Sequence, residues 1–383
     1  TRNSWTLGPD LDPFFFLRWA KLIVENGSLP AIDVMRYVPL GFDTLKETRL
    51  LPYLIAYLHK ILSFFEPGVS VEYAAVILPV VASVFAVIGF FLLVRKIFEE
   101  KGEMISNLIA VIAGAFLITL PSLLPRTIAG IPEKESVGFA LMFFAFYFFI
   151  AAWKSKTIKK SFILSLLAGL FTSLMGLIWG GVEFIYVALA IAGFIAFILG
   201  KIERRELIVY STWIIGSMVF WIPFTLRMTL KSFLMTSSTA AALAVFFFML
   251  VHFGIFKTKL KNLKILENKI ISKIPKMFIS ILVSLILLIV LSSVFLGPST
   301  LYDLIKQTIS QLFQPYTSRL LFTVAENKQP YFNDWKGSFG PVIKNIPLFF
   351  WLFFVGSIFL FYEMVKKLNI KERLILTFSY LMF

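Results

Sequence analysis

Residues 71–94 read VEYAAVILPVVASVFAVIGFFLLV, and Glu72 is their only charged residue. A helix needs roughly 20 apolar residues to cross the hydrocarbon core of a bilayer, so this stretch predicts a membrane-spanning helix. Similar runs lie at 105–124, 136–153, 161–178, 181–200, 207–226, 233–255, 277–296 and 343–365, and another opens near 373. The sequence therefore predicts an all-α polytopic membrane protein with about nine complete spans.

The composition agrees with lipid as the solvent. The chain is 58% hydrophobic and 15% charged, whereas a water-soluble domain averages about 45–50% apolar and about 25% charged residues. Its net charge is +15, but no basic stripe stands apart from the apolar runs, so we expect no nucleic-acid partner. There are no cysteines, which excludes disulfides and thiolate metal sites.

The lysines and arginines are distributed unevenly between the loops. Segment 257–276 alone holds seven lysines. Cytoplasmic loops of membrane proteins carry an excess of Lys and Arg, so the basic set of loops is expected inside. That set comprises the loops near 95–101, 154–160, 201–205, 257–276 and 366–373. The pattern predicts a multi-pass protein of the plasma membrane, with the remaining segments on the extracytoplasmic face.

Four regions follow from this topology. Residues 1–70 form a first extracytoplasmic loop with amphipathic helices, expected at Pro13–Glu25 and Lys46–Phe65. Residues 71–296 form a transmembrane bundle of about eight spans. The long extracytoplasmic loop 297–342 is of a length that is usually functional or disordered. Region 343–383 holds one span and the start of another that the sequence does not complete.

Acidic residues on the predicted outer side gather in three places. Asp12 opens an aromatic stretch, Glu133 and Glu135 precede the span at 136–153, and Glu326 lies in the long late loop. Each has a local alternative: Asp12 as a helix cap, the glutamate pair as a complement to the helix dipole, and Glu326 as a solvated side chain. Carboxylate oxygens are also the ligands that Mg²⁺ and Mn²⁺ prefer. Asp12, Glu133 and Glu135 together predict a divalent-metal site that also binds phosphate oxygens.

Four short stretches resemble motifs of oligosaccharyltransferase catalytic subunits of the archaeal type, which are dolichyl-(di)phosphooligosaccharide–protein glycotransferases. They are DPFFFLR at 12–18, RTIAGIPEKE at 126–135, WGG at 179–181 and TVAENKQP at 323–330. Glu133 stands where the family more often has Asp. The family's Trp-Trp-Asp-Tyr-Gly motif, from a C-terminal soluble domain, does not occur in the sequence. The resemblance covers the membrane portion of the family and leans toward an archaeal source.

The resemblance implies a GT-C-type glycosyltransferase. Such an enzyme moves an oligosaccharide from a dolichyl or polyprenyl (di)phosphate carrier to the Asn of Asn-x-Ser/Thr. By position, Asp12 and Glu326 would grip the acceptor amide, with Thr323 beside Glu326 in the acceptor loop. Asp12, Glu133 and Glu135 would hold Mn²⁺ or Mg²⁺ opposite the leaving phosphate. The expected partners are the lipid-linked oligosaccharide, the acceptor sequon and membrane lipid.

Two further outer residues have weaker assignments. Arg126 is a candidate contact for donor phosphate or for an acid. Trp179 is a candidate contact for donor phosphate or lipid, although an interfacial tryptophan anchor is the favoured explanation. Asn26 lies in the sequon Asn26-Gly27-Ser28 and is a possible glycosylation acceptor.

Two other functions compete with this interpretation. The first is another polyprenyl-phosphate-sugar-dependent transferase, such as a protein O-mannosyltransferase, which has no need of a Thr-x-x-Glu motif in a late loop. The second is a transporter or lipid flippase, which should carry ionisable residues at mid-membrane depth and internal inverted repeats. The predicted spans are nearly free of charge in their interiors, and Glu183 is the main exception.

Overall fold

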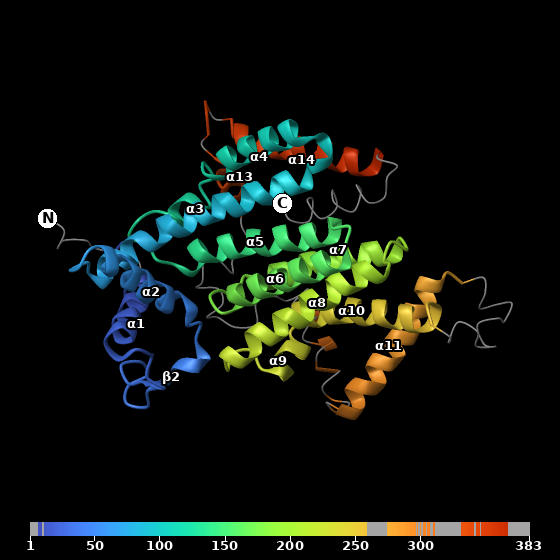
Figure 1. Ribbon diagram of the computed structural model, residues 1–383, viewed down its shortest axis with the longest axis horizontal. Coiled ribbons are helices and arrows are strands. Elements are labelled where there is room, and N and C mark those ends of the chain that lie inside the picture. The colour runs from blue at the N-terminus through green and yellow to red at the C-terminus, as the bar shows by residue number, and fades with distance from the viewer. Residues whose placement is uncertain are drawn as a thin grey trace.

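The computed structural model describes residues 7–9, 11–258, 274–295, parts of 297–310, and 331–366 apart from 341 and 345. Long helices run side by side along the length of the molecule, and short elements cover one end of the bundle (Figure 1). The long and medium helices are α3 (Val71–Ile97), α4 (Glu103–Leu117), α5 (Lys134–Lys154), α6 (Ile158–Gly176), α7 (Val182–Ile198), α8 (Arg204–Trp221), α10 (Ser237–Phe256), α11 (Lys276–Phe295) and α14 (Leu348–Lys366). The prediction of an all-α polytopic fold is confirmed.

The shorter elements lie before and between these helices. They are α1 (Asp12–Asn26), the antiparallel pair β1 (Ile32–Asp33) and β2 (Phe42–Asp43), η1 (Thr44–Lys46), α2 (Leu50–Phe65), η2 (Glu99–Lys101), η3 (Leu124–Arg126), η4 (Ile222–Phe224), α9 (Leu230–Met235) and α13 (Phe332–Gly337). Helix α1 starts with proline in its first turn and ends at Gly27, whose φ of 78° lets its N–H bond back to Ile23. The expected helix over Lys46–Phe65 begins later, at Leu50, because Lys46 belongs to η1.

Each of the nine predicted runs contains a helix in the structure. Six of these helices are long and apolar enough to cross a membrane by length and composition: α3, α5, α6, α8 with η4, α10 and α11. Two predicted boundaries are wrong because of proline, which lacks an N–H and disfavours helix in the residue before it. Helix α4 stops at Leu117, short of Pro121, and α14 begins at Leu348, directly after Pro347.

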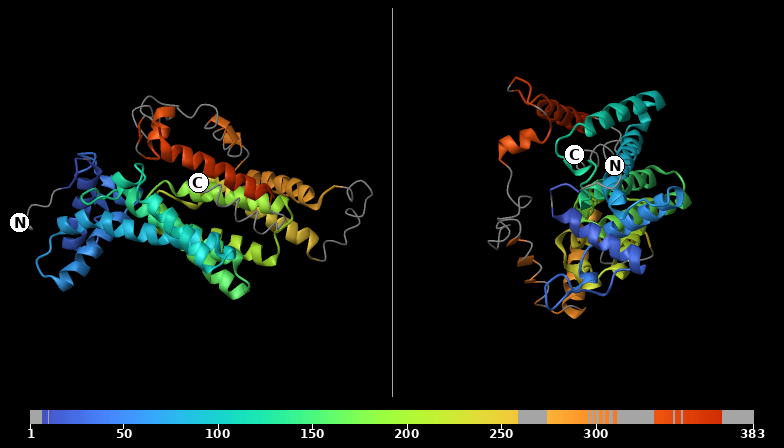
Figure 2. Two further views of the ribbon diagram at one scale, coloured as in Figure 1. Left: turned by 90° about the horizontal axis from the view of Figure 1, so that it is seen from above. Right: turned by 90° about the vertical axis from the view of Figure 1, so that its left-hand side faces the viewer.

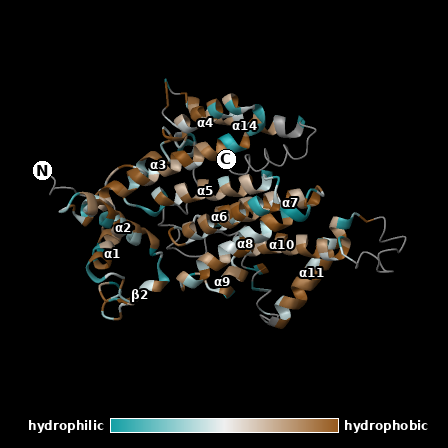
Figure 3. Cartoon of the chain, viewed as in Figure 1, coloured by the Kyte–Doolittle hydropathy of each residue, from teal (hydrophilic) through white to brown (hydrophobic). Residues whose placement is uncertain are grey.

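The core of the bundle forms around α5. Phe146 and Phe149 are fully buried there, and the ring of Phe149 meets the ring of Trp213 on α8 edge to face at 5.5 Å. Gly169 lets α6 approach α8, since a side chain there would place its Cβ 2.8 Å from the carbonyl oxygen of Trp213. Small residues let helices in lipid approach closely and pack by van der Waals contact, because no hydrophobic effect drives them together there. Apolar residues dominate the long helices and polar ones gather at the ends (Figure 3).

Hydrogen bonds between loops show which helix ends lie together. The Gly130 N–H bonds the carbonyl of Val76 at 2.9 Å, and the Leu50 N–H bonds that of Leu177 at 3.4 Å. The starts of α3 and α5 and the end of α6 therefore lie with α1 and α2, at what we call the α1 end (Figures 1 and 2). At the opposite end, Arg205 donates to the carbonyl of Ser155 at 2.6 Å. This grouping of loops agrees with the lysine and arginine pattern, while the side that faces the cytoplasm stays a prediction.

Candidate functional site

The segment that leads into α1 is attached to the loop that leads into α5. The N–H of Gly8 donates to the carbonyl of Gly130 at 2.8 Å. A side chain at residue 8 would not fit, because its Cβ would lie 2.9 Å from Cγ1 of Ile131. Gly130 itself has a φ of 91°, a conformation that favours glycine. These contacts bring two of the three predicted acidic clusters to the same end of the bundle.

Glu133 is buried at the start of α5, with 5% of its surface exposed. It is the N-cap residue of α5, but its side chain does not cap the helix. Its carboxylate pairs instead with Arg126, the last residue of η3. The carbonyl of Glu133 accepts a 2.7 Å bond from the Ser136 hydroxyl. The Arg126 guanidinium can also bind an anion, and the Glu133 carboxylate can also bind a cation. Capping of α5 therefore does not explain why Glu133 is buried at this position.

A cavity of about 470 Å³ opens beside this pair. Its lining comprises Pro121, Ser122, Pro125, Arg126, Ile131 and Glu133. The cavity is polar on one side, because Arg126, Glu133 and Ser122 contribute to its wall, and it lies at the α1 end. A small charged group fits this combination of space and charge.

The other two predicted metal ligands lie at the same end of the bundle. Glu135 is half-buried in the first turn of α5, and Asp12 is exposed in the first turn of α1. The N-cap position of α1 is Leu11, so Asp12 is not the N-cap residue. Within the described residues, no three His, Asp or Glu side chains converge closely enough to hold a metal ion. The donor chemistry fits a hard divalent cation, and Glu133 is held in its ion pair with Arg126.

Sequence reasoning missed a buried carboxylate in the first loop. Asp33 is 2% exposed and accepts bonds from both terminal nitrogens of Arg18, from the Trp19 indole at 2.8 Å and from the Met35 N–H at 3.1 Å. The Arg18 hydrogen bond, ahead of all other causes, lowers the pKa of Asp33 to about 2. The arginine of the 12–18 motif therefore anchors the β1–β2 hairpin to α1. The sequence shows only that Asp33 is charged. A charged side chain that is buried needs a partner, but the sequence does not show which residue that partner is.

Trp179 packs on the first turns of α5. A Cβ on Gly138 would lie 2.9 Å from its ring, and a Cβ on Gly181 would lie 2.5 Å from it. The ring also meets Phe139 edge to face at 5.6 Å. The half-buried indole thus supports the helix that carries Glu133 and Glu135. This position accounts for Gly181, because a larger residue there would displace the ring, whereas a Cβ on Gly180 would meet nothing within 4 Å.

The remaining predicted site residues differ in what the structure says of them. Asn26 is exposed at the last position of α1. Thr323 and Glu326 lie outside the described residues.

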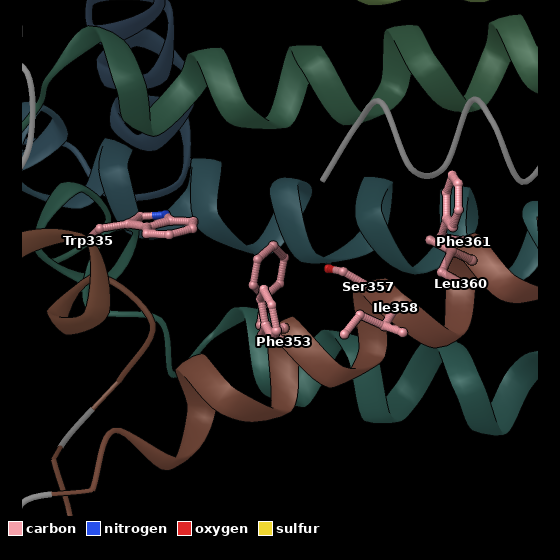
Figure 4. A pocket seen from close by; sticks show the side chains of 7 residues that line it. Trp335, Phe353, Ser357, Ile358, Leu360 and Phe361 are labelled. Carbon is pink, nitrogen blue, oxygen red and sulfur yellow. The ribbon is translucent and has the colours of Figure 1, made fainter. Parts of the chain in front are cut away.

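A second cavity, of about 500 Å³, lies along α14 beside α13 (Figure 4). Its lining is aromatic and aliphatic, with one hydroxyl: Trp335, Phe353, Phe354, Ser357, Ile358, Leu360 and Phe361. No ionisable side chain is among them. Such a groove matches a hydrocarbon chain and offers nothing for acid, base or phosphate chemistry.

The fold and the α1 end define a class: a polytopic helical membrane protein with buried and exposed carboxylates gathered at one end of its bundle. The family model described as oligosaccharyl transferase STT3, N-terminal, matches residues 4–380. The chain belongs to this family, which confirms the resemblance of its four motifs.

Relatives from two yeasts share this similarity. The stt3 subunit of the dolichyl-diphosphooligosaccharide–protein glycosyltransferase of Schizosaccharomyces pombe is 26% identical over 216 residues, covering 55% of this chain and 27% of that protein. The Saccharomyces cerevisiae STT3 subunit is 25% identical over 289 residues, covering 70% and 35%. The chain thus spans about a third or less of these curated relatives.

Solved structures of the Archaeoglobus fulgidus oligosaccharyltransferase share the fold. The enzyme AglB, in complex with an inhibitory peptide and a dolichol-phosphate, matches with a TM-score of 0.71 and 19% identity, covering 100% of this chain and 46% of that one. A complex with Zn and sulfate matches with a TM-score of 0.65 and 19% identity, covering 100% and 43%. The GT-C-type membrane fold implied by the resemblance is confirmed.

Proposed function

We propose that the protein is a glycosyltransferase that moves an oligosaccharide from a polyprenyl or dolichyl (di)phosphate carrier to the Asn of Asn-x-Ser/Thr. Membership of the STT3 family supports this reaction class. The observation that carries the proposal is the attachment of the Asp12 segment to the Glu133 loop through Gly8 and Gly130. This contact supports the proposal because residues 12–18 and 126–135 lie at one end of the bundle, where we infer that a lipid-linked donor and a polypeptide acceptor meet.

The chain's own carboxylates perform the work on the acceptor. An amide nitrogen is a poor nucleophile, because its lone pair is delocalised into the carbonyl. In the proposed reaction, Asp12 and Glu326 accept hydrogen bonds from the acceptor amide N–H groups and reduce that conjugation. Asp12 is exposed and so accessible to a peptide. Thr323 lies beside Glu326 in the proposed acceptor loop.

The donor is held by its phosphate and its lipid. Arg126 provides a guanidinium for phosphate oxygens beside the 470 Å³ cavity. A divalent ion, Mn²⁺ or Mg²⁺, held by Asp12, Glu133 and Glu135, would supply positive charge opposite the leaving phosphate. Trp179 keeps the start of α5 in place for these contacts. A related archaeal structure contains a dolichol-phosphate, which supports a lipid-phosphate donor here.

The acceptor is inferred from a related structure, and the membrane face is inferred from the charges of the loops. A related structure is tethered to an acceptor peptide containing the NVT sequon, and it shares this fold at 17% identity and a TM-score of 0.64. We infer that the site faces the outside of the plasma membrane, since the basic loops that the structure describes, near 95–101, 154–160 and 201–205, lie at the opposite end of the bundle.

The test uses membranes containing the protein, a labelled sequon peptide and a lipid-linked oligosaccharide. Transfer is assayed with Mn²⁺, with EDTA, and with the variant Glu326→Gln. Metal-dependent glycopeptide that disappears in the variant supports the proposal. Folded protein that forms no glycopeptide under any of these conditions favours a different polyprenyl-phosphate sugar transferase.

A further inference from the structure

The sequence holds one Asn-x-Ser/Thr sequon, Asn26-Gly27-Ser28, and it lies at the carboxyl end of α1. Asn26 is the last residue of that helix, and Gly27 is its C-cap residue. No other asparagine of the sequence is followed two places later by Ser or Thr. An N-linked glycan on these residues would therefore be attached to Asn26.

The sequon is exposed in the folded structure. Residues 24–28 form an exposed run, whereas Ile23 and Leu29 on either side are buried, with 5% and 8% of their surfaces exposed. Among the described residues, neither the Asn26 amide nor the Ser28 hydroxyl makes a side-chain hydrogen bond, so both groups are available to an enzyme. A glycan on Asn26 would extend into solvent and displace no packed side chain.

The backbone of the sequon can open while the rest of α1 stays folded. The Gly27 N–H bonds the Ile23 carbonyl at 2.8 Å as the cap of the helix. Helix ends fray at a lower cost than helix centres, so this turn can open locally. Leu29 keeps the chain after the sequon in place, because its N–H bonds the Tyr53 hydroxyl at 3.2 Å. A folded copy can therefore present Asn26 in an extended segment.

The position of Asn26 excludes the site of its own chain as the source of a glycan. Asp12, assigned above to the acceptor amide, is the first residue of α1, and Asn26 is the last. A helix rises about 1.5 Å per residue, so these residues lie about 21 Å apart along α1, whereas a hydrogen bond needs about 3 Å. The middle of the helix is fixed, because Trp19 is fully buried and its indole bonds Asp33 at 2.8 Å.

We propose that Asn26 is an N-glycosylation acceptor that is modified in trans, by the site of a second copy of this protein. The inference rests on the proposed function, which supplies the transfer. In this step the Asn26 amide nitrogen forms a bond to the anomeric carbon of the oligosaccharide and gives up one proton to a carboxylate of that site. The bond between the anomeric carbon and the phosphate oxygen breaks, and the lipid phosphate leaves with its electron pair.

The test uses two tagged copies of the full-length protein in cells that supply the lipid-linked oligosaccharide. The recipient copy carries Asp12→Ala and an intact sequon, and the active copy carries Asn26→Gln. We expect glycopeptide mass spectrometry to find the glycan on Asn26 of the recipient when both copies are present, and to find none when the recipient is alone.

Two matched changes in the recipient examine the acceptor itself. Ser28→Ala should lower the modified fraction about 100-fold or more, because a site built to bond a hydroxyl rejects an acceptor that lacks it. Ser28→Thr keeps the hydroxyl and should keep the glycan. Asn333 on α13 is also exposed but lies in Asn-Asp-Trp, so it should stay unmodified. Thermal unfolding in detergent shows whether each variant is folded.

Three results would overturn the inference. They are an unmodified Asn26 in a folded recipient beside the active copy, a glycan on Asn26 when the recipient is alone, and equal modification of Ser28→Ala. Transfer to a labelled sequon peptide separates this inference from the proposed function. If the active copy modifies the peptide but not Asn26, the inference fails and the proposed function stands; if it modifies neither, both fail.

Discussion

The two ends of the bundle both carry ion pairs, and the pairs of Arg95 and Lys96 differ in kind from those at the α1 end. At the opposite end, Arg95 pairs with Glu103 at 3.2 Å and Lys96 with Glu99 at 2.5 Å, and these partners are partly or fully exposed and near in sequence. At the α1 end, Asp33, Glu47 and Glu133 are largely buried, and Glu47 meets partners from distant segments. Exposed pairs contribute little to stability, whereas breaking a buried pair leaves a costly unpaired charge. The opposite end also holds buried charges, since Lys154 pairs with Glu99 and Glu206 pairs with Arg205, and the Lys154 and Glu206 side chains are each 6% exposed. The contrast therefore concerns the exposed pairs of Arg95 and Lys96.

The largest expected effect is on activity at the α1 end. Glu133→Gln keeps the size of the side chain but removes a charge assigned to the metal, and it should lower glycan transfer about 100-fold or more. Transfer to a labelled sequon peptide measures the effect. The matched change at the opposite end, Glu103→Gln, should keep full activity. Comparable activity in both variants would show that Glu133 is not part of the site, and that the glutamates at the two ends do not differ in their contribution to transfer.

The next effect is on stability. Asp33→Asn removes the charge that receives Arg18, so we expect a loss of about 2–3 kcal/mol in the free energy of unfolding. The pair Arg95–Glu103 is exposed, and Glu103→Gln should cost less than about 0.5 kcal/mol. Thermal unfolding in detergent, with proteolysis of the first loop as a local readout, compares the two. Equal stability of the variants would mean that burial does not distinguish the two ends.

The same carboxylate should make the α1 end sensitive to acid. The folded pKa of Asp33, about 2, lies below the unfolded value of about 3.9. The stabilisation is therefore complete above about pH 4 and is lost as the pH falls toward about 2. A shift of nearly two units corresponds to about 2.5 kcal/mol. Melting temperatures between pH 7 and pH 3 should fall less steeply for Asp33→Asn than for the unaltered protein, and parallel slopes would contradict the assignment.

Much of this fold was predictable because the solvent imposes it. Each span needs a long apolar run, and such runs are visible without any tertiary information. The boundaries were harder, because proline decides them locally: the helices near Pro121 and Pro347 are shorter than their apolar runs. The break between α9 and α10 at Thr236 was also missed, although four consecutive hydroxyl residues, 236–239, interrupt the run 233–255 there.

The candidate site was predictable in its acids but not in their partners. Asp12, Glu133 and Glu135 could be placed on one side of the membrane, because the order of the predicted spans determines the side on which each loop lies. Asp33 and Glu47 could not be found, since their roles depend on partners that only the folded chain brings near. Glu47 and Arg227 illustrate this: they are separated by most of the bundle in sequence and lie 3.5 Å apart.

The smallest expected effect concerns Trp179, whose support of α5 sharpens the picture of a rigid α1 end. Gly138→Ala improves helix propensity by about 1 kcal/mol, but its Cβ would lie 2.9 Å from the indole ring and must displace it. We expect nearly unchanged stability and a two- to fivefold loss of transfer, about 0.4–1 kcal/mol in the barrier. A Cβ added at Gly254 on α10 would meet open space within 4 Å, so Gly254→Ala should leave transfer unchanged. Full activity in Gly138→Ala would show that the start of α5 tolerates movement of Trp179, and that this tryptophan serves only as an anchor at the membrane surface.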